Sequence, residues 1–260
     1  RPLVLGKLDD SYILSSESCG LDIIGANLIR DVEPGEILII KNNKIDSIKP
    51  FKKTYLRPCL FEYIYFSRPD SILEGRNVYD VRKSIGHQLA VENPNDNKII
   101  DVVIPIPDSG NASALGYSEK IKKPFEFGII RNHYTGRTFI EDSISVRNLS
   151  VKLKHNPNIF SFKDKSIALV DDSIVRGTTS VKIVEMLRNC GVKNVHMRIA
   201  SPPVKHPCFY GIDTPTKEEL LASKFTIDQI KKYIGADSLK FVTLDGVYKA
   251  LGFQNGREKE

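Results

Sequence analysis

The sequence predicts an α/β protein in which a parallel sheet carries helices on both faces, preceded by a separate β-rich segment. Residues 1–50 alternate short apolar runs with turn signals, which is typical of antiparallel strands. From about residue 75 onward, apolar runs of strand length alternate with helical stretches, which is the pattern of parallel strands joined by helical crossovers. The 260-residue chain is 41% hydrophobic, which is ample for a buried core.

The β-rich segment has apolar runs at residues 3–5, 12–14 and 37–40, with turn signals at Pro34-Gly35 and Asn42-Asn43. Hairpins of this kind need a partner layer for stability, and few residues here could supply one. We therefore expect residues 1–50 to be the end of a larger β-containing domain, and residues 51–74 to be a connecting segment.

The α/β part begins with a helix predicted at 78–92 and a strand at 99–106, whose β-branched apolar run indicates burial on both faces. The elements that follow the turn at 107–110 are a helix at 112–122, strands at 125–130 and 167–170, a helix at 178–190 closed by Gly191, and a strand at 195–200. The tail, residues 216–260, shows two short helical patterns around Lys231 and Val247.

The net charge of +6 is concentrated in one segment, because residues 120–154 hold eight basic and three acidic side chains. This balance suits an anionic partner. No helix-turn-helix or aromatic-rich RNA motif is present, so we expect no nucleic acid. No apolar stretch approaches the length of a membrane span and no leader pattern opens the chain, so we expect a cytoplasmic protein that binds no membrane. The four cysteines lie far apart in the sequence, which is a poor framework for disulfides, so we expect reduced thiols or scattered metal ligands.

The strongest motif spans residues 167–180, where an apolar strand ends in paired carboxylates and turns through a glycine into a helix. The first amides of that helix have no intrahelical partner, so they suit a phosphate dianion, while the carboxylates suit a vicinal diol or hydrated Mg²⁺. Together they indicate a ribose 5-phosphate, with Asp171, Asp172, Ser173, Arg176, Gly177, Thr178, Thr179 and Ser180 as the predicted binding residues. The alternative is a plain helix cap made by Thr178 or Thr179.

A second strand end, turn and helix start occurs at Asp108, Ser109 and Gly110. Ligands bind at the carboxyl ends of strands in parallel sheets, so this loop should lie beside the first. Its amides and the Ser109 hydroxyl would then meet a pyrophosphate or its Mg²⁺. A Ser cap with Gly for the turn is the alternative, and both interpretations can hold together.

Residues 131–154 form a connection that is too long and too polar for a minimal loop. We expect it to close over a substrate, with Arg137, Arg147 and Lys152 as catalytic cations that stabilise a departing pyrophosphate. The alternative is a mobile basic surface loop.

With these motifs in place, the sequence resembles the glutamine phosphoribosylpyrophosphate amidotransferases nearly end to end. The strings that carry the resemblance are residues 1–6, 62–71, 107–110, 131–139, 170–180, 201–203 and 206–213. The resemblance implies a type I phosphoribosyltransferase domain at 75–215, a remnant of an N-terminal-nucleophile glutaminase domain at 1–50, and a C-terminal helical segment at 216–260.

The family's reaction is phosphoribosyl transfer from 5-phosphoribosyl-1-pyrophosphate to ammonia, taken from glutamine, in the first step of purine synthesis. The resemblance therefore implies these substrates, purine nucleotides as feedback inhibitors and a homo-oligomer. It also implies Mg²⁺ at Ser109, Asp171 and Asp172. One branch holds a 4Fe-4S cluster whose first two ligands match Cys59 and Cys208, although a lone cysteine is more often a buried apolar residue.

Two departures from the family pattern stand out. The glutaminase of this family uses an N-terminal cysteine, whereas this chain begins with Arg1, and the other two cluster cysteines would fall at or beyond its end. We therefore expect a chain truncated at both ends, whose transferase half uses free ammonia. The alternatives are a non-catalytic regulatory module that binds phosphoribosyl pyrophosphate, and another phosphoribosyltransferase such as a purine salvage enzyme.

Overall fold

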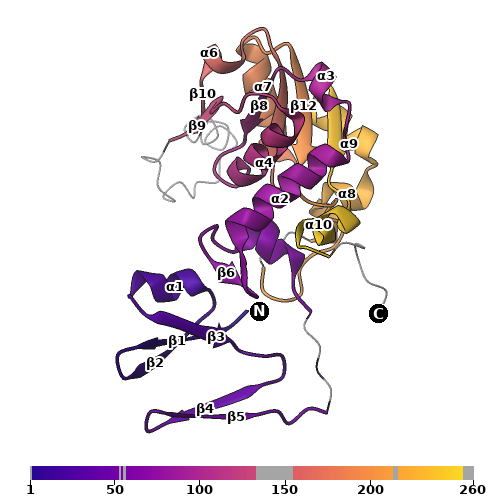
Figure 1. The fold of residues 1–260 in the computed structure, drawn as a ribbon. Coiled ribbons are helices and arrows are strands. Elements are labelled where there is room, and N and C mark those ends of the chain that lie inside the picture. The colour runs from indigo at the N-terminus through magenta and orange to yellow at the C-terminus, as the bar shows by residue number, and fades with distance from the viewer. Residues whose placement is uncertain (1, 53, 55–56, 133–154, 213–215, 254–260) are drawn as a thin grey trace, which may run out of the picture. The chain divides into compact units, whose positions relative to one another are not determined.

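The computed structural model describes residues 2–52, 54, 57–132, 155–212 and 216–253. The chain forms two compact units, Arg1–Val81 and Arg82–Glu260 (Figure 1). No helix in the described residues is long and apolar enough to cross a membrane.

The first unit is built from antiparallel strands, as predicted. A three-stranded sheet has the order β2-β1-β3, and a separate hairpin joins β4 to β5. The hairpin turns at Asn42 and Asn43, both with positive φ, a conformation that asparagine tolerates better than most residues. The elements are β1 (Val4–Leu8), β2 (Ser11–Ser15), α1 (Ser18–Ile23), β3 (Asn27–Asp31), β4 (Ile37–Lys41), β5 (Lys44–Ile48), a π-helix (Glu62–Phe66), β6 (Ile72–Leu73) and β7 (Arg76–Asn77).

The second unit contains a four-stranded parallel sheet of order β13-β12-β11-β8. Helices separate these strands along the chain, so the α/β class predicted from the alternating pattern is confirmed. The elements are α2 (Val78–Val91), α3 (Asp96–Ile99), β8 (Val102–Pro105), α4 (Asn111–Ile121), β9 (Ile129–Arg131), β10 (His155–Pro157), α6 (Ile159–Phe162), β11 (Ser166–Asp171), α7 (Thr178–Asn189), β12 (Asn194–Ile199), a 3-10 helix (Lys217–Glu219), α8 (Leu221–Lys224), α9 (Ile227–Ile234), β13 (Ser238–Phe241) and α10 (Leu244–Ala250).

Helices cover both faces of this sheet (Figure 1). Alternate residues of a strand point to opposite faces, and on one face Ile167 and Leu169 join a buried cluster with α7 and α9. On the other face, α4 packs against β8 and β11. The residues between, such as Ala168 and Val170, are equally buried, so the central strand has no solvated face.

A buried ion pair crosses the α4 side of the sheet. The Arg198 guanidinium on β12 binds both carboxylate oxygens of Asp96, at 2.6 and 2.7 Å, and also donates to the hydroxyl of Ser238. The Tyr117 hydroxyl of α4 donates to the same carboxylate. The Arg198 and Asp96 side chains are 2% and 8% exposed, so this polar network lies in the interior and ties α3 and α4 to β12.

Three predicted elements differ from the structure. The strand expected at 99–106 is shorter, because Asp96–Ile99 is a helical turn fixed by the Asp96 ion pair. The strand expected at 125–130 is a single bridge from Phe125 to Val103, followed by β9, which pairs antiparallel with β10. Strand β13 was not expected, because its four residues carry too short a pattern to distinguish from a loop.

Candidate functional site

Two buried carboxylates stand at the carboxyl end of the central strand β11. Asp171 and Asp172 are 7% and 5% exposed. The Asp172 backbone N–H donates to Asp171 Oδ1 at 2.9 Å, and the Ser173 hydroxyl donates to Asp172 Oδ2 at 2.6 Å. These local hydrogen bonds orient both side chains, so the pair is organised before any ligand binds.

Burial raises the pKa of Asp171 well above its usual range, and the adjacent charge of Asp172 raises it further. An ionised carboxylate in this position is therefore costly without a partner. A hydrogen-bond donor such as a ribose hydroxyl, or a divalent cation, would favour the ionised form. Strongly shifted carboxyl groups at the end of a strand are typical of functional sites.

The loop after Asp172 leads into an open helix N-terminus. Gly177 is the N-cap of α7 and has φ of +73°, which a glycine adopts without strain. Because Gly177 has no side chain, it cannot itself accept a hydrogen bond from the first amides of α7. The first amides of α7 therefore keep their capacity to bind an anion, with Thr178, Thr179 and Ser180 supplying hydroxyls in the first turn.

The second predicted loop lies beside the first. Strand β8 runs parallel to β11, with Pro105 opposite Val170, and the Ile106 N–H donates to the Val170 carbonyl at 2.8 Å. A Cβ at Gly110 would lie 2.5 Å from that carbonyl oxygen, so only glycine allows the approach. The structure thus brings Asp108, Ser109 and Gly110 to the same sheet edge as Asp171, as the sequence predicts.

A cation from another strand reaches this second loop. Arg131, at the end of β9, forms an ion pair with the Asp108 carboxylate, and both side chains are about half exposed (52%). The sheet edge therefore combines buried carboxylates, an open helix terminus and an exposed arginine. Such a set can bind a ligand with phosphate groups at one part and hydroxyls at another.

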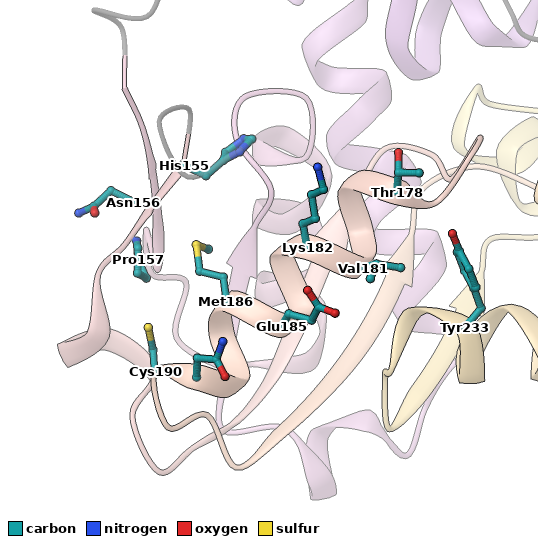
Figure 2. A pocket seen from close by; sticks show the side chains of 11 residues that line it. His155, Asn156, Pro157, Thr178, Val181, Lys182, Glu185, Met186, Cys190 and Tyr233 are labelled. Carbon is teal, nitrogen blue, oxygen red and sulfur yellow. The ribbon is translucent and has the colours of Figure 1, made fainter. Parts of the chain in front are cut away.

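A groove of about 820 Å³ runs along the exposed side of α7, next to this edge (Figure 2). Thr178 lies at one end of the groove, Lys182 and Met186 line its floor, and Tyr233 of α9 borders it. Neither aspartate lines it. The groove therefore adjoins the phosphate end of the candidate site rather than the carboxylate pair.

Some predicted site residues are not brought together by the described structure. Arg137, Arg147 and Lys152 fall within 133–154, outside the described residues. Cys59 is exposed in the first unit, and Cys208 is partly buried in the second, where its sulfur accepts the Tyr210 N–H.

The donor set at the sheet edge fits Mg²⁺ better than it fits a larger metal centre. Mg²⁺ prefers one or two carboxylates together with ligand oxygens, and the two aspartates supply that chemistry. Among the residues that the structure describes, no group of three or more His, Cys, Asp or Glu side chains could hold a metal. A 4Fe-4S cluster needs four thiolates, and neither Cys59 nor Cys208 belongs to a group of three or more ligating side chains in the described residues, so these residues do not fit a cluster.

The sequence of the sheet edge matches a known family. The model of the phosphoribosyl transferase domain matches residues 70–201, which include both loops, the basic connection and the strands that carry them. The chain belongs to the phosphoribosyl transferase domain family. Its parallel sheet and flanking helices are therefore the type I phosphoribosyltransferase fold, as expected from the resemblance.

Comparison with individual relatives extends the likeness beyond this domain. The amidophosphoribosyltransferase of Rhizobium etli is 54% identical over 97% of this chain and 51% of its own length. The Bacillus subtilis enzyme is 46% identical over 97% of this chain and 52% of its own. These matches confirm the resemblance to the amidotransferases. The chain spans about half the length of the curated relatives it matches.

Solved structures show the same likeness. The glutamine phosphoribosylpyrophosphate amidotransferase of B. subtilis, complexed with ADP and GMP, superposes with a TM-score of 0.89 at 46% identity. The match covers 97% of this chain and 55% of that one. This agreement extends over the β-rich first unit as well as the phosphoribosyltransferase fold.

Sequence reasoning missed residues that reach the site from elsewhere in the chain. Ser201, two residues after β12, has a buried hydroxyl oxygen without a hydrogen-bond partner among the described residues. Glu219 and Leu221 contact the phosphate loop, defined here as residues 173–177. The string 201–203 belongs to the family resemblance but gave Ser201 no role, and no local pattern marks Glu219 or Leu221, because these contacts depend on how distant segments pack.

Proposed function

We propose that this chain transfers the phosphoribosyl group of 5-phosphoribosyl-1-pyrophosphate to ammonia, giving 5-phosphoribosylamine and pyrophosphate at the start of purine synthesis. One observation carries the proposal: the buried Asp171–Asp172 pair stands between an open helix N-terminus and a second loop at one sheet edge. This arrangement matches the three parts of the substrate, which are a 5-phosphate, a ribose diol and a pyrophosphate.

Each part of the site has a proposed role. The amides of the phosphate loop and the hydroxyls of Thr178, Thr179 and Ser180 bind the 5-phosphate. Asp171 and Asp172 accept hydrogen bonds from the ribose hydroxyls, which offsets the cost of burying their charge. Asp108, Ser109 and Gly110 bind the pyrophosphate.

During the reaction the bond between ribose C1 and the pyrophosphate oxygen breaks, and the ammonia nitrogen bonds to C1 and releases a proton. Positive charge develops at C1 while negative charge accumulates on the leaving group, so cations beside the pyrophosphate favour departure. We assign this role to Arg137, Arg147 and Lys152. When bound at Ser109, Asp171 and Asp172, Mg²⁺ would neutralise pyrophosphate charge.

The test is pyrophosphate release from phosphoribosyl pyrophosphate and Mg²⁺, with ammonia or glutamine as nitrogen donor. We expect turnover of the 260-residue chain with ammonia, and its loss in Asp171→Asn, which removes one carboxylate charge without changing side-chain size. Asp228→Asn is the matched control, because Asp228 is exposed on α9. Substrate binding without turnover with either nitrogen donor would refute the transferase function and support a non-catalytic regulatory module.

Regulation and assembly are further parts of the proposal. The solved B. subtilis relative was complexed with ADP and GMP, which supports purine nucleotides as inhibitors of this chain. Inhibition of ammonia-dependent turnover by GMP, measured at fixed substrate, tests this. We also propose a homo-oligomer, which sedimentation of the purified chain would check.

A further inference from the structure

The phosphate loop is held by a segment far along the chain. The Val175 carbonyl accepts the backbone N–H of Leu221 at 3.0 Å. The Leu221 side chain lies where a side chain at Gly177 would stand, since a Cβ there would be 2.3 Å from Leu221 Cδ1 and 3.4 Å from Tyr233. The loop backbone is therefore held from outside by a hydrogen bond from α8, rather than by bonds within the loop alone.

A charged contact completes this support. Arg176, inside the loop, donates from Nη2 to Glu219 Oε2 at 3.1 Å, and both side chains are about half exposed. This hydrogen bond lowers the pKa of Glu219, so the carboxylate is ionised at neutral pH. The backbone on either side of Glu219 is also held, because the Ser223 hydroxyl lies within hydrogen-bond distance of the carbonyls of Lys217 and Leu220, at 2.6 and 2.7 Å, and donates its one hydrogen to either of them.

The arrangement matters because the loop carries both amides and an arginine. A phosphate dianion at the start of α7 attracts the Arg176 guanidinium, which would draw the loop inward and change the direction of its N–H groups. Glu219 opposes that movement. An amide site that is preorganised binds an anion more tightly than one that must be rearranged.

We propose that Glu219 is a positioning residue, which pairs with Arg176 to keep the phosphate loop open for the 5-phosphate of the substrate. The identity of the ligand in this inference rests on the proposed function. The contact between Glu219 and Arg176 does not depend on it. Glu219 touches no substrate in this assignment. It acts through Arg176, with Leu221 as the apolar part of the same support.

The experiment compares Glu219→Gln with Glu218→Gln, a matched control one residue away that does not pair with Arg176 in the described contacts. Breaking an exposed ion pair of this kind changes affinity by roughly 1.4- to 5-fold. We expect Glu219→Gln to raise the KM for phosphoribosyl pyrophosphate by a factor in this range and to leave kcat nearly unchanged. Glu218→Gln should match the wild type.

A second variant separates positioning from direct contact. If Glu219 acts by restraining Arg176, then Glu219→Gln should raise the KM only when Arg176 is present. Arg176→Gln and the double variant should then share one KM, close to that of the wild type. If Arg176 instead binds the phosphate itself, Arg176→Gln will be much weaker than Glu219→Gln, and Glu219→Gln will bind as well as or better than the wild type. That second pattern would overturn the proposal.

Amide hydrogen exchange of residues 173–177 in the free chain needs no ligand. Faster exchange in Glu219→Gln than in Glu218→Gln is expected, and equal exchange would refute the positioning role. A wild-type chain that fails to bind phosphoribosyl pyrophosphate would refute the proposed function, while the exchange comparison would still decide whether Glu219 holds the loop.

Discussion

Breaking the buried Asp96–Arg198 pair should destabilise the second unit more than any surface change. In the wild type, the two carboxylate oxygens of Asp96 accept hydrogen bonds from the Arg198 guanidinium at 2.6 and 2.7 Å. Asp96→Asn keeps the shape of the side chain, but it replaces one of these oxygens with an N–H₂ group, which cannot accept from the guanidinium. The Arg198 charge is left buried without a compensating anion. Removing one partner of such a pair costs about 3–5 kcal/mol. The Asp228→Asn control removes a contact of an 87% exposed carboxylate and should cost at most about 0.5 kcal/mol.

The pH dependence of this effect has a defined sign. Burial raises the pKa of Asp96, but hydrogen bonds and charge from Arg198, with the Tyr117 hydroxyl, lower it by more, so the net pKa lies below its usual value. A carboxyl group with a lowered folded pKa stabilises the protein above its unfolded pKa of about 4, and this contribution is lost as the pH falls through the folded value. The difference between wild type and Asp96→Asn should therefore shrink in acid.

Urea unfolding followed by far-ultraviolet circular dichroism measures both effects. The double variant Asp96→Leu/Arg198→Met should be less destabilised than Asp96→Asn, because no charge remains buried. A cost below about 1 kcal/mol for Asp96→Asn, against the expected 3–5 kcal/mol, would refute the reasoning. A double variant that unfolds as easily as Asp96→Asn would also refute it.

Three further changes have expected outcomes. Asp171→Asn should raise the free energy of unfolding by about 0.5–2 kcal/mol at neutral pH, because burial disfavours the ionised carboxylate of the wild type. In a urea titration, an unfolding midpoint of the variant below that of the wild type would contradict this. Gly177→Ala should cost about 1–3 kcal/mol, since φ is +73° and a Cβ would lie 2.3 Å from Leu221, and calorimetry should show weaker binding of ribose 5-phosphate. Gly86→Ala should cost a similar amount, about 1–3 kcal/mol, because its Cβ would lie 1.8 Å from the Ser113 carbonyl oxygen, and unchanged thermal unfolding would contradict this.

Much of the fold could be predicted because the relevant patterns are local. The apolar run before Asp171 predicts a buried strand, and the helix that follows ends at Asn189, just before Gly191, whose φ of +85° suits the residue after a helix C-cap. The short elements were harder. Strand β13 and the helical turn Asp96–Ile99 owe their conformation to neighbours in space, so their own residues carry little signal.

The candidate site likewise has features that the local sequence predicts and features that depend on contacts between distant residues. The sequence alone predicted the groups at the end of β11, because the two carboxylates, the glycine and the helix start all lie within residues 171–178. Strand order in a parallel sheet also allowed the second loop to be placed beside the first, which the hydrogen bond from Ile106 to Val170 bears out.

Only the tertiary structure decided which residues far apart in the sequence pair with one another. Arg176 and Glu219 are 43 residues apart, and Asp96 and Arg198 are 102 apart, so no periodic pattern links either pair. Each is a contact between side chains whose partners are chosen by the packing of helices on the sheet. The sequence thus determines which groups stand at the end of β11, and the folded chain determines which distant residues contact them, because those contacts exist only after long-range packing.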